Sequence, residues 1–250
     1  NDASTEQFTE NFSNLSNFNS IQVINLKNNI GHTRCIATGL MHINENEEFD
    51  YVIPMDGDGE DRPEEIKLFI ENFNYHPNKT IVGERVKRSE SILFKLCYSF
   101  HKILTYTFTG QSIKFGNYTC LTKSTIEKML RDKATWSSFS GSLAKNCNNK
   151  AAISSERGKR YFGPSKMSFL NLIKHSLAII GVFKFSVLVR SILFVLVYMF
   201  LIHQKISFIM ILPVIFIAIF LISTFIISQR GSLDEMNNSL SNILIIDKIK

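Results

Sequence analysis

The stretch FDYVIPMDGDGED, residues 49–61, joins an apolar run directly to a cluster of carboxylates. The apolar half has the length and composition of a short buried strand. The acidic half follows without a linker, so its carboxylates are expected at the carboxyl end of that strand. A sheet that carries charged groups at its strand ends is therefore the first expectation.

Strand and helix signals alternate around this stretch. Apolar runs predict strands at 21–26 and 80–83, and apolar residues at helical spacing predict helices at 31–43 and 64–72. The second helix begins after Pro63 and has an acidic first turn, which the helix dipole favours. The alternation predicts an α/β fold, a mostly parallel sheet with helices on both faces. Ligands of such sheets bind at the carboxyl ends of the strands, where the acidic cluster lies.

The acidic cluster has the composition of a divalent-cation site. Asp56, Asp58 and Glu60 alternate with single residues, so their carboxylates can converge on one ion. Oxygen ligands around an ion that also holds substrate phosphates are typical of Mg²⁺ or Mn²⁺. We therefore predict these three residues as the metal ligands.

Three other interpretations of the cluster were weighed. An EF-hand loop needs Gly at its sixth position and Glu at its twelfth, where this sequence has Asp61 and Lys67. A phosphatase of the haloacid dehalogenase type shares the Asp-x-Asp-Gly start but needs a later acidic motif that is missing, and it is kept as an alternative function. A solvated acidic turn is disfavoured, because carboxylates crowded at a strand end repel one another unless a cation neutralises them.

Composition changes abruptly at about residue 166. The sequence before it is polar and mixed, whereas residues 167–228 are overwhelmingly apolar. We predict a soluble domain over 1–166, an interfacial amphipathic helix over 167–184, and two transmembrane helices over 185–228 that form a hairpin. The remaining residues, 229–250, are predicted as a tail.

Charge indicates the orientation and the kind of partner. Lys184, Arg190 and Arg230 outnumber Lys205 of the hairpin loop, which predicts a two-pass membrane protein with its soluble domain and tail in the cytoplasm. The net charge of +6 suits an anionic partner. Nucleic acid is excluded because the basic residues form no Lys/Arg tract. The four cysteines are isolated and are predicted to be reduced structural thiols.

Two strings resemble family 2 glycosyltransferases, NIGHTRCIATGL at 29–40 and MDGDGEDRPEE at 55–65. They are most similar to the branch of dolichol-phosphate mannose synthases and bacterial polyprenyl-phosphate glycosyltransferases. The resemblance runs to about Ile202 and implies a GT-A type fold, Rossmann-like, for the catalytic domain. The opening NDAST resembles the family's Asp-Asp-Gly-Ser-Thr turn, which implies that Asp2 contacts the nucleoside.

The family's first strand carries a Pro-x-Tyr-Asn-Glu-like motif that is absent here. The difference is about 30 residues, one strand–helix–strand unit. We therefore expect the sequence to be truncated at its amino end.

Basic residues follow the strand signal at 80–83, and others precede the apolar region. The resemblance implies that Arg85 and Arg88 hold the phosphate of the acceptor lipid, and guanidinium groups bind phosphate in a bidentate way. Arg160, Ser165 and Lys166 match the family's Arg-x-x-Gly-x-Ser-Lys motif and are implied at the donor diphosphate. A juxtamembrane basic patch attracted to lipid headgroups is the alternative for this segment.

Two further segments are less specific. Residues 92–108 fit a core helix or a membrane-surface helix equally well. Residues 115–118 resemble the Gly-Asn-Phe segment that the family has near its acceptor site, with no role assigned here.

The expected function is transfer of a sugar from a nucleotide-sugar donor to a polyprenyl phosphate, undecaprenyl or dolichyl, for a cell-envelope glycan. The reaction is expected to be inverting and to depend on Mg²⁺ or Mn²⁺, with Asp58, Arg85 and Arg88 as catalytic residues. A processive polysaccharide synthase is disfavoured, since its Gln-x-x-Arg-Trp motif is missing and the one tryptophan is Trp136. A non-catalytic membrane scaffold is the remaining alternative, and homo-oligomerisation stays open.

Overall fold

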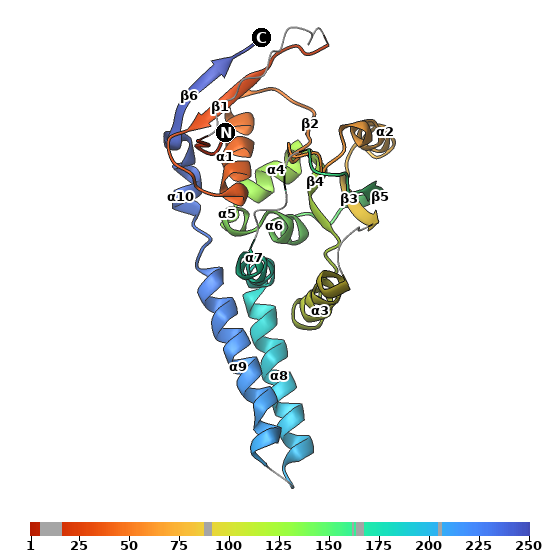
Figure 1. Ribbon diagram of the computed structural model, residues 1–250, viewed down its shortest axis with the longest axis vertical. Coiled ribbons are helices and arrows are strands. Elements are labelled where there is room, and N and C mark those ends of the chain that lie inside the picture. The colour runs from red at the N-terminus through yellow and green to blue at the C-terminus, as the bar shows by residue number, and fades with distance from the viewer. Residues whose placement is uncertain (6–16, 88–91, 162, 164–167, 205–206) are drawn as a thin grey trace.

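The computed structural model describes residues 1–5, 17–87, 92–161, 163, 168–204 and 207–250. An α/β part lies at one end of the molecule, and a hairpin of two long helices extends from it (Figure 1). The sequence-based expectation of an α/β fold is confirmed, whereas the predicted sheet topology is not.

The main sheet has four strands in the order β2(Tyr51–Val52), β4(Phe115–Thr122), β3(Thr80–Lys87), β5(Lys150–Glu156). Strand β4 is antiparallel to both β2 and β3, and only β3 and β5 are parallel. The prediction of a mostly parallel sheet is therefore wrong. The cause is β4, which the alternation argument did not include and which inserts between the two predicted strands in the opposite direction.

The strand register brings four strand ends together. Val52 pairs with Leu121, and Glu84 pairs with both Phe115 and Ser154. With these directions, the carboxyl ends of β2, β3 and β5 and the amino end of β4 meet at one edge of the sheet. The chain segments that leave or enter the sheet there supply the charged groups of the site.

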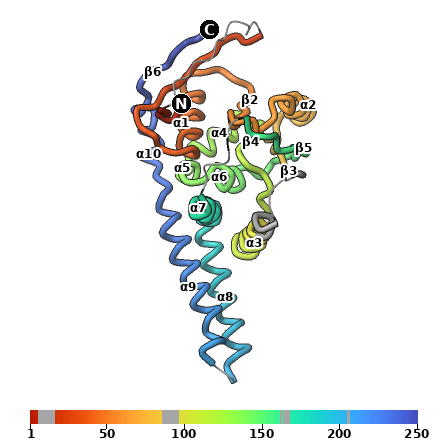
Figure 2. Tube along the Cα trace, viewed as in Figure 1, coloured from red at the N-terminus to blue at the C-terminus, as the bar shows by residue number. Residues whose placement is uncertain are grey.

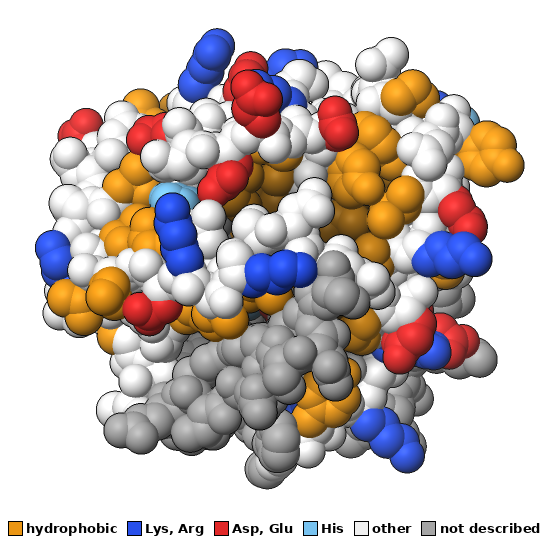
Figure 3. Space-filling view, turned by 90° about the horizontal axis from the view of Figure 1, so that it is seen from above, with side chains coloured by type: hydrophobic (Ala, Val, Ile, Leu, Met, Phe, Trp, Pro, Cys, Tyr) orange, Lys and Arg blue, Asp and Glu red, His pale blue; other side chains and the backbone are white. Residues whose placement is uncertain are grey.

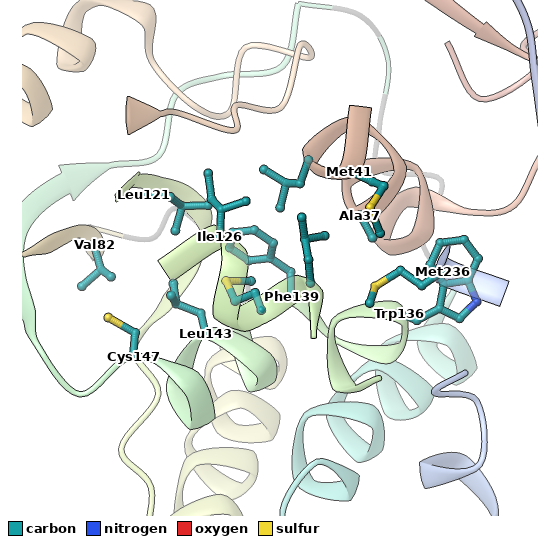
Figure 4. Packing of buried hydrophobic residues seen from close by; sticks show 13 residues of the cluster. Ala37, Met41, Val82, Leu121, Ile126, Trp136, Phe139, Leu143, Cys147 and Met236 are labelled. Carbon is teal, nitrogen blue, oxygen red and sulfur yellow. The ribbon is translucent and has the colours of Figure 1, made fainter. Parts of the chain in front are cut away.

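Helices cover both faces of the sheet. Because successive strand residues point to opposite faces, Ile81 and Cys120 pack under α2(Ile66–Tyr75), which follows the 3₁₀ turn η1(Pro63–Glu65). Val82 and Leu121 join the larger core on the other face (Figure 4). The helices of that core are α1(His32–Asn46), α4(Lys123–Leu130), α5(Ala134–Ser137), α6(Phe139–Asn146) and α10(Leu233–Asn237).

A second, two-stranded sheet joins the two ends of the chain. The predicted strand at 21–26 exists as β1(Gln22–Leu26), but it pairs antiparallel with β6(Ile243–Lys248) outside the main sheet. Figure 2 shows the trace of these distant segments running side by side. Residues 233–250, assigned to a tail from the sequence, thus form α10, η2(Ser239–Asn242) and β6 against the α/β part.

Four helices pack together beside the α/β part, and the last two extend from it: α3(Ile92–Thr109), α7(Phe169–Gly181), α8(Lys184–Ile202) and α9(Phe208–Ser228). Within the described residues, α8 and the helical stretch beginning at Phe208 are long and apolar enough to cross a membrane. Of the most apolar 18 residues in each, only 11% are buried in α8 and 17% in the stretch beginning at Phe208. Helix α3 is tied to α8, because the Ser186 hydroxyl donates to the Thr109 carbonyl at 3.3 Å.

Candidate functional site

The acidic loop after β2 is organised around a buried carboxylate, Asp61, whose relative exposure is 2%. One oxygen accepts the Asp56 backbone N–H at 3.0 Å, and the other accepts Arg85 Nη2 at 2.9 Å. Burial raises the pKa of Asp61 above its ordinary value, although the bond from Asp56 and the charge of Arg85 oppose that change. Asp61 therefore fixes both the start of the acidic loop and the guanidinium at the end of β3.

The segment after β5 closes over the same loop through two arginines. Glu60 receives hydrogen bonds from Arg157 and from Arg160 Nε, the latter at 2.9 Å, and Arg160 Nη2 also contacts Asp58 Oδ2 at 2.9 Å. Although burial alone would raise the pKa of Glu60, the hydrogen bonds and charges of Arg160 and Arg157 lower it below its ordinary value. Glu60 is thus an ionised anchor for the arginine segment.

Backbone contacts hold these two segments together as well. The Gly158 N–H donates to the Glu60 carbonyl, and the Tyr161 N–H donates to the Asp58 carbonyl, both at 2.9 Å. Gly59 adopts φ 88°, and a Cβ there would meet the Tyr161 ring at 2.8 Å. Gly59 therefore permits the close approach of the segment after β5, which the sequence motif alone did not reveal.

Asp2 caps the chain just before α1. Its two carboxylate oxygens accept the backbone N–H groups of Ile30 at 2.8 Å and Gly31 at 2.9 Å. Gly31 adopts φ 87°, in the region that favours glycine. Asp2 thereby fixes the turn that places His32, the first residue of α1, at the site.

His32 and Asn117 lie beside Asp56, at the start of the acidic loop. His32 Nε2 is 3.5 Å from Asp56 Oδ1 and 2.6 Å from Asn117 Nδ2. Neither residue was given a role from the sequence, and neither was Arg157. The strings around His32 and Asn117 drew attention to their segments, but only the fold shows that α1 and β4 begin beside the same carboxylate.

Most of the described residues predicted for the site come together in this way. The arginines Arg85 and Arg160 contact the loop that carries Asp56, Asp58 and Glu60. Asp2 is linked to the site indirectly, because it binds the backbone of the two residues before His32. Arg88, Ser165 and Lys166 lie outside the described residues. Seen from the end opposite the helical hairpin, this part of the molecule has a hollow with acidic and basic side chains around it (Figure 3).

The residues present fit a divalent cation only in part. Among the described residues, no group of three or more His, Cys, Asp and Glu side chains is placed to hold a metal ion. Glu60 is occupied by its arginines and Asp58 contacts Arg160, although the side chains of Asp56 and Asp58 are 26% and 34% exposed. Mg²⁺ is commonly held by one or two carboxylates together with substrate phosphates. Asp56 and Asp58 are two such carboxylates, of which Asp58 also contacts Arg160.

One comparison with known proteins gives a match. Residues 1–137, more than half of the chain, match the family model described as glycosyl transferase family 2. No curated protein matches the chain. The matched range ends within α5, and it contains the acidic loop, Asp2, His32, Arg85 and Asn117.

Proposed function

Because the chain belongs to glycosyl transferase family 2 and is a glycosyltransferase with a nucleotide-sugar donor, we propose that its acceptor is a polyprenyl phosphate at a membrane surface. One observation supports this acceptor above others. The segment that closes over the acidic loop, residues 157–161, continues into α7, α8 and α9. An amphiphilic acceptor held by a membrane could thus present its phosphate beside the donor site.

The donor diphosphate is proposed to lie over Asp56 and Asp58. A Mg²⁺ or Mn²⁺ ion bound there would neutralise the diphosphate charge. Arg160 would add hydrogen bonds to the same oxygens, together with Ser165 and Lys166 of the sequence motif. Its present partners, Asp58 and Glu60, show that its guanidinium already reaches the loop. Glu60, predicted as a third ligand, instead anchors Arg157 and Arg160 in this arrangement.

The acceptor phosphate is proposed to be held by Arg85 and Arg88. Arg85 uses one nitrogen for Asp61 and retains other N–H donors on its planar group. An oxygen of the lipid phosphate attacks the anomeric carbon. A bond forms between them while the bond from that carbon to the diphosphate breaks, which inverts the anomeric centre. The phosphate is already ionised near neutral pH, so positioning and charge stabilisation carry the reaction.

The membrane arrangement completes the proposal. Helices α8 and α9 would form a two-pass hairpin with the α/β part in the cytoplasm, and α7 would lie at the interface. The exposed apolar side chains of α7, Phe169, Leu170 and Ile173, support that placement. A role in a cell-envelope glycan follows from such an acceptor.

The test uses the full-length protein in membranes, with radiolabelled nucleotide sugars and undecaprenyl or dolichyl phosphate. We expect label in the lipid fraction that requires Mn²⁺ or Mg²⁺ and falls about 100-fold in Asp58→Asn. Asp50→Asn is the matched control, since Asp50 is exposed and lies before the acidic loop. Transfer that is unchanged in Asp58→Asn or with a chelator would refute the metal site, and label only in other acceptors would refute the lipid.

A further inference from the structure

Three of the carboxylates of the acidic loop contact arginines. Asp58 and Glu60 contact Arg160, Glu60 also contacts Arg157, and Asp61 is buried against Arg85. The carboxylate of Asp56 instead contacts His32, and His32 in turn contacts Asn117. A donor whose diphosphate lies over Asp56 and Asp58 therefore has an imidazole and an amide, not arginines, beside the first residue of the loop.

His32 and Asn117 have the chemistry of a hydroxyl-binding pair. The amide offers N–H donors and a carbonyl acceptor, and the two ring nitrogens of an imidazole can donate or accept, whereas a sugar hydroxyl is both donor and acceptor. The His32 side chain is 59% exposed, so the ring is accessible. The Asn117 amide nitrogen lies 2.6 Å from His32 Nε2, so the two side chains are held side by side.

The positions of the two residues are set by the fold. His32 follows the turn that Asp2 holds through Ile30 and Gly31, and Asn117 lies in β4 between β2 and β3. Neither depends on a long flexible connection. Fixed hydrogen-bonding groups of this kind can discriminate between sugars that differ in one hydroxyl, because a missing hydroxyl leaves the protein groups unpaired.

We propose that His32 and Asn117 bind hydroxyl groups of the transferred sugar and thereby select the donor. The inference rests on the proposed donor site and adds a specificity role to it. It separates the sugar from the nucleotide: the pair contributes to binding of the nucleotide sugar and little to binding of the nucleoside diphosphate.

The test compares His32→Ala and Asn117→Ala with the wild-type full-length protein. Titration calorimetry measures affinity for UDP, GDP, UDP-glucose and GDP-mannose in the presence of Mn²⁺. We expect each variant to bind the preferred nucleotide sugar about tenfold more weakly, with less than about a twofold change for the matching diphosphate. His76→Ala and Asn74→Ala are matched controls, since both residues are exposed at the carboxyl end of α2. Thermal unfolding verifies that all four variants are folded.

Deoxy analogues of the preferred donor supply the second measurement. The wild type should discriminate against the analogue that lacks the contacted hydroxyl, and the variants should lose that discrimination, as in a double-mutant cycle. Equal losses for diphosphate and nucleotide sugar would place the pair at the nucleotide and overturn the inference, as would unchanged discrimination. If the wild type binds no nucleotide sugar, the proposed function fails and this inference with it.

Discussion

Gly158 approaches the carbonyl oxygen of Gly59 so closely that a Cβ at this position would overlap it. The contact is between two backbones, so no flexible side chain can move away. We expect Gly158→Ala to destabilise the α/β part by about 2 kcal/mol, because one segment must shift. Urea unfolding followed by the fluorescence of Trp136, the one tryptophan in the sequence, measures this.

Gly57 provides the matched control in the same loop. A Cβ there meets nothing within 4 Å, and no positive φ is recorded for it. Gly57→Ala should therefore change the free energy of unfolding by no more than about 0.5 kcal/mol. Equal effects of the two substitutions would show that the segment after β5 does not lie against the acidic loop.

Glu60 makes stability depend on pH through its two arginines. Its folded pKa is lower than the ordinary value of 4.5, despite burial, because Arg160 and Arg157 stabilise the carboxylate. Its contribution, about 2 kcal/mol for hydrogen bonds between charged groups, is therefore present above pH 4.5 and is lost as pH falls through the folded pKa. Glu60→Gln should be less stable than the wild type at pH 7, and the difference should shrink below pH 4.5.

The measurement is urea unfolding of both proteins across pH 3–7. Glu64→Gln is the control, because the Glu64 side chain is 74% exposed and its pair with Arg62 is long, at 3.8 Å. If the free energies of unfolding of the wild type and Glu60→Gln differed by a constant amount across this pH range, the arginine contacts would be contradicted.

At the scale of elements, the segment after α9 belongs to the core of the α/β part. Met236 of α10 is fully buried in the main core, where Figure 4 shows it with Trp136, and the Trp136 indole N–H donates to Glu235 at 2.7 Å. We expect Met236→Ala to lower the free energy of unfolding by about 3 kcal/mol, which is within the range for large-to-small core substitutions. The same Trp136 fluorescence reports it directly.

Leu244 of β6 is the control for Met236, since it lies in the same terminal segment but is 65% exposed. The free energy of unfolding of Leu244→Ala should stay within about 0.5 kcal/mol of the wild-type value. If Met236→Ala were equally mild, α10 would not be packed in the core in solution.

The elements show which physical signals a sequence carries. Helix α1 and strand β1 were predicted because apolar spacing is local to each segment. The pairing of Asn25 with Ile245 joins residues far apart in the chain, and no local pattern specifies such a partner or its direction. Strand β4 was missed for the same reason, and with it the mixed topology of the sheet.

The candidate site was predictable to the extent that it depends on strand ends. Asp58 and Arg85 were expected together because both follow strands of one sheet, and the register brings those ends to one edge. The closure of Arg157 over Glu60 and the meeting of His32 with Asn117 depend on how loops fold over one another. Such contacts follow from tertiary packing, which neither spacing nor composition encodes.

At the scale of the whole molecule, the β1–β6 pairing fixes the topology of the hairpin. Because β6 follows α9 and pairs with a strand of the α/β part, the two ends of the α8–α9 hairpin must lie on the same side of any membrane it crosses. The turn at His203 and Gln204 would then lie on the other side. An epitope inserted after Gln204 and an epitope added after Lys250 should be digested from opposite faces of sealed vesicles.

The two epitopes serve as controls for each other in vesicles of known orientation. An epitope after Glu48, between α1 and β2, should behave like the one after Lys250, because both belong to the α/β part. Detergent should abolish all protection. Digestion of the Gln204 and Lys250 epitopes from the same face would show that the hairpin enters the membrane without crossing it, and the acceptor lipid would then have to reach the acidic loop from the interface alone.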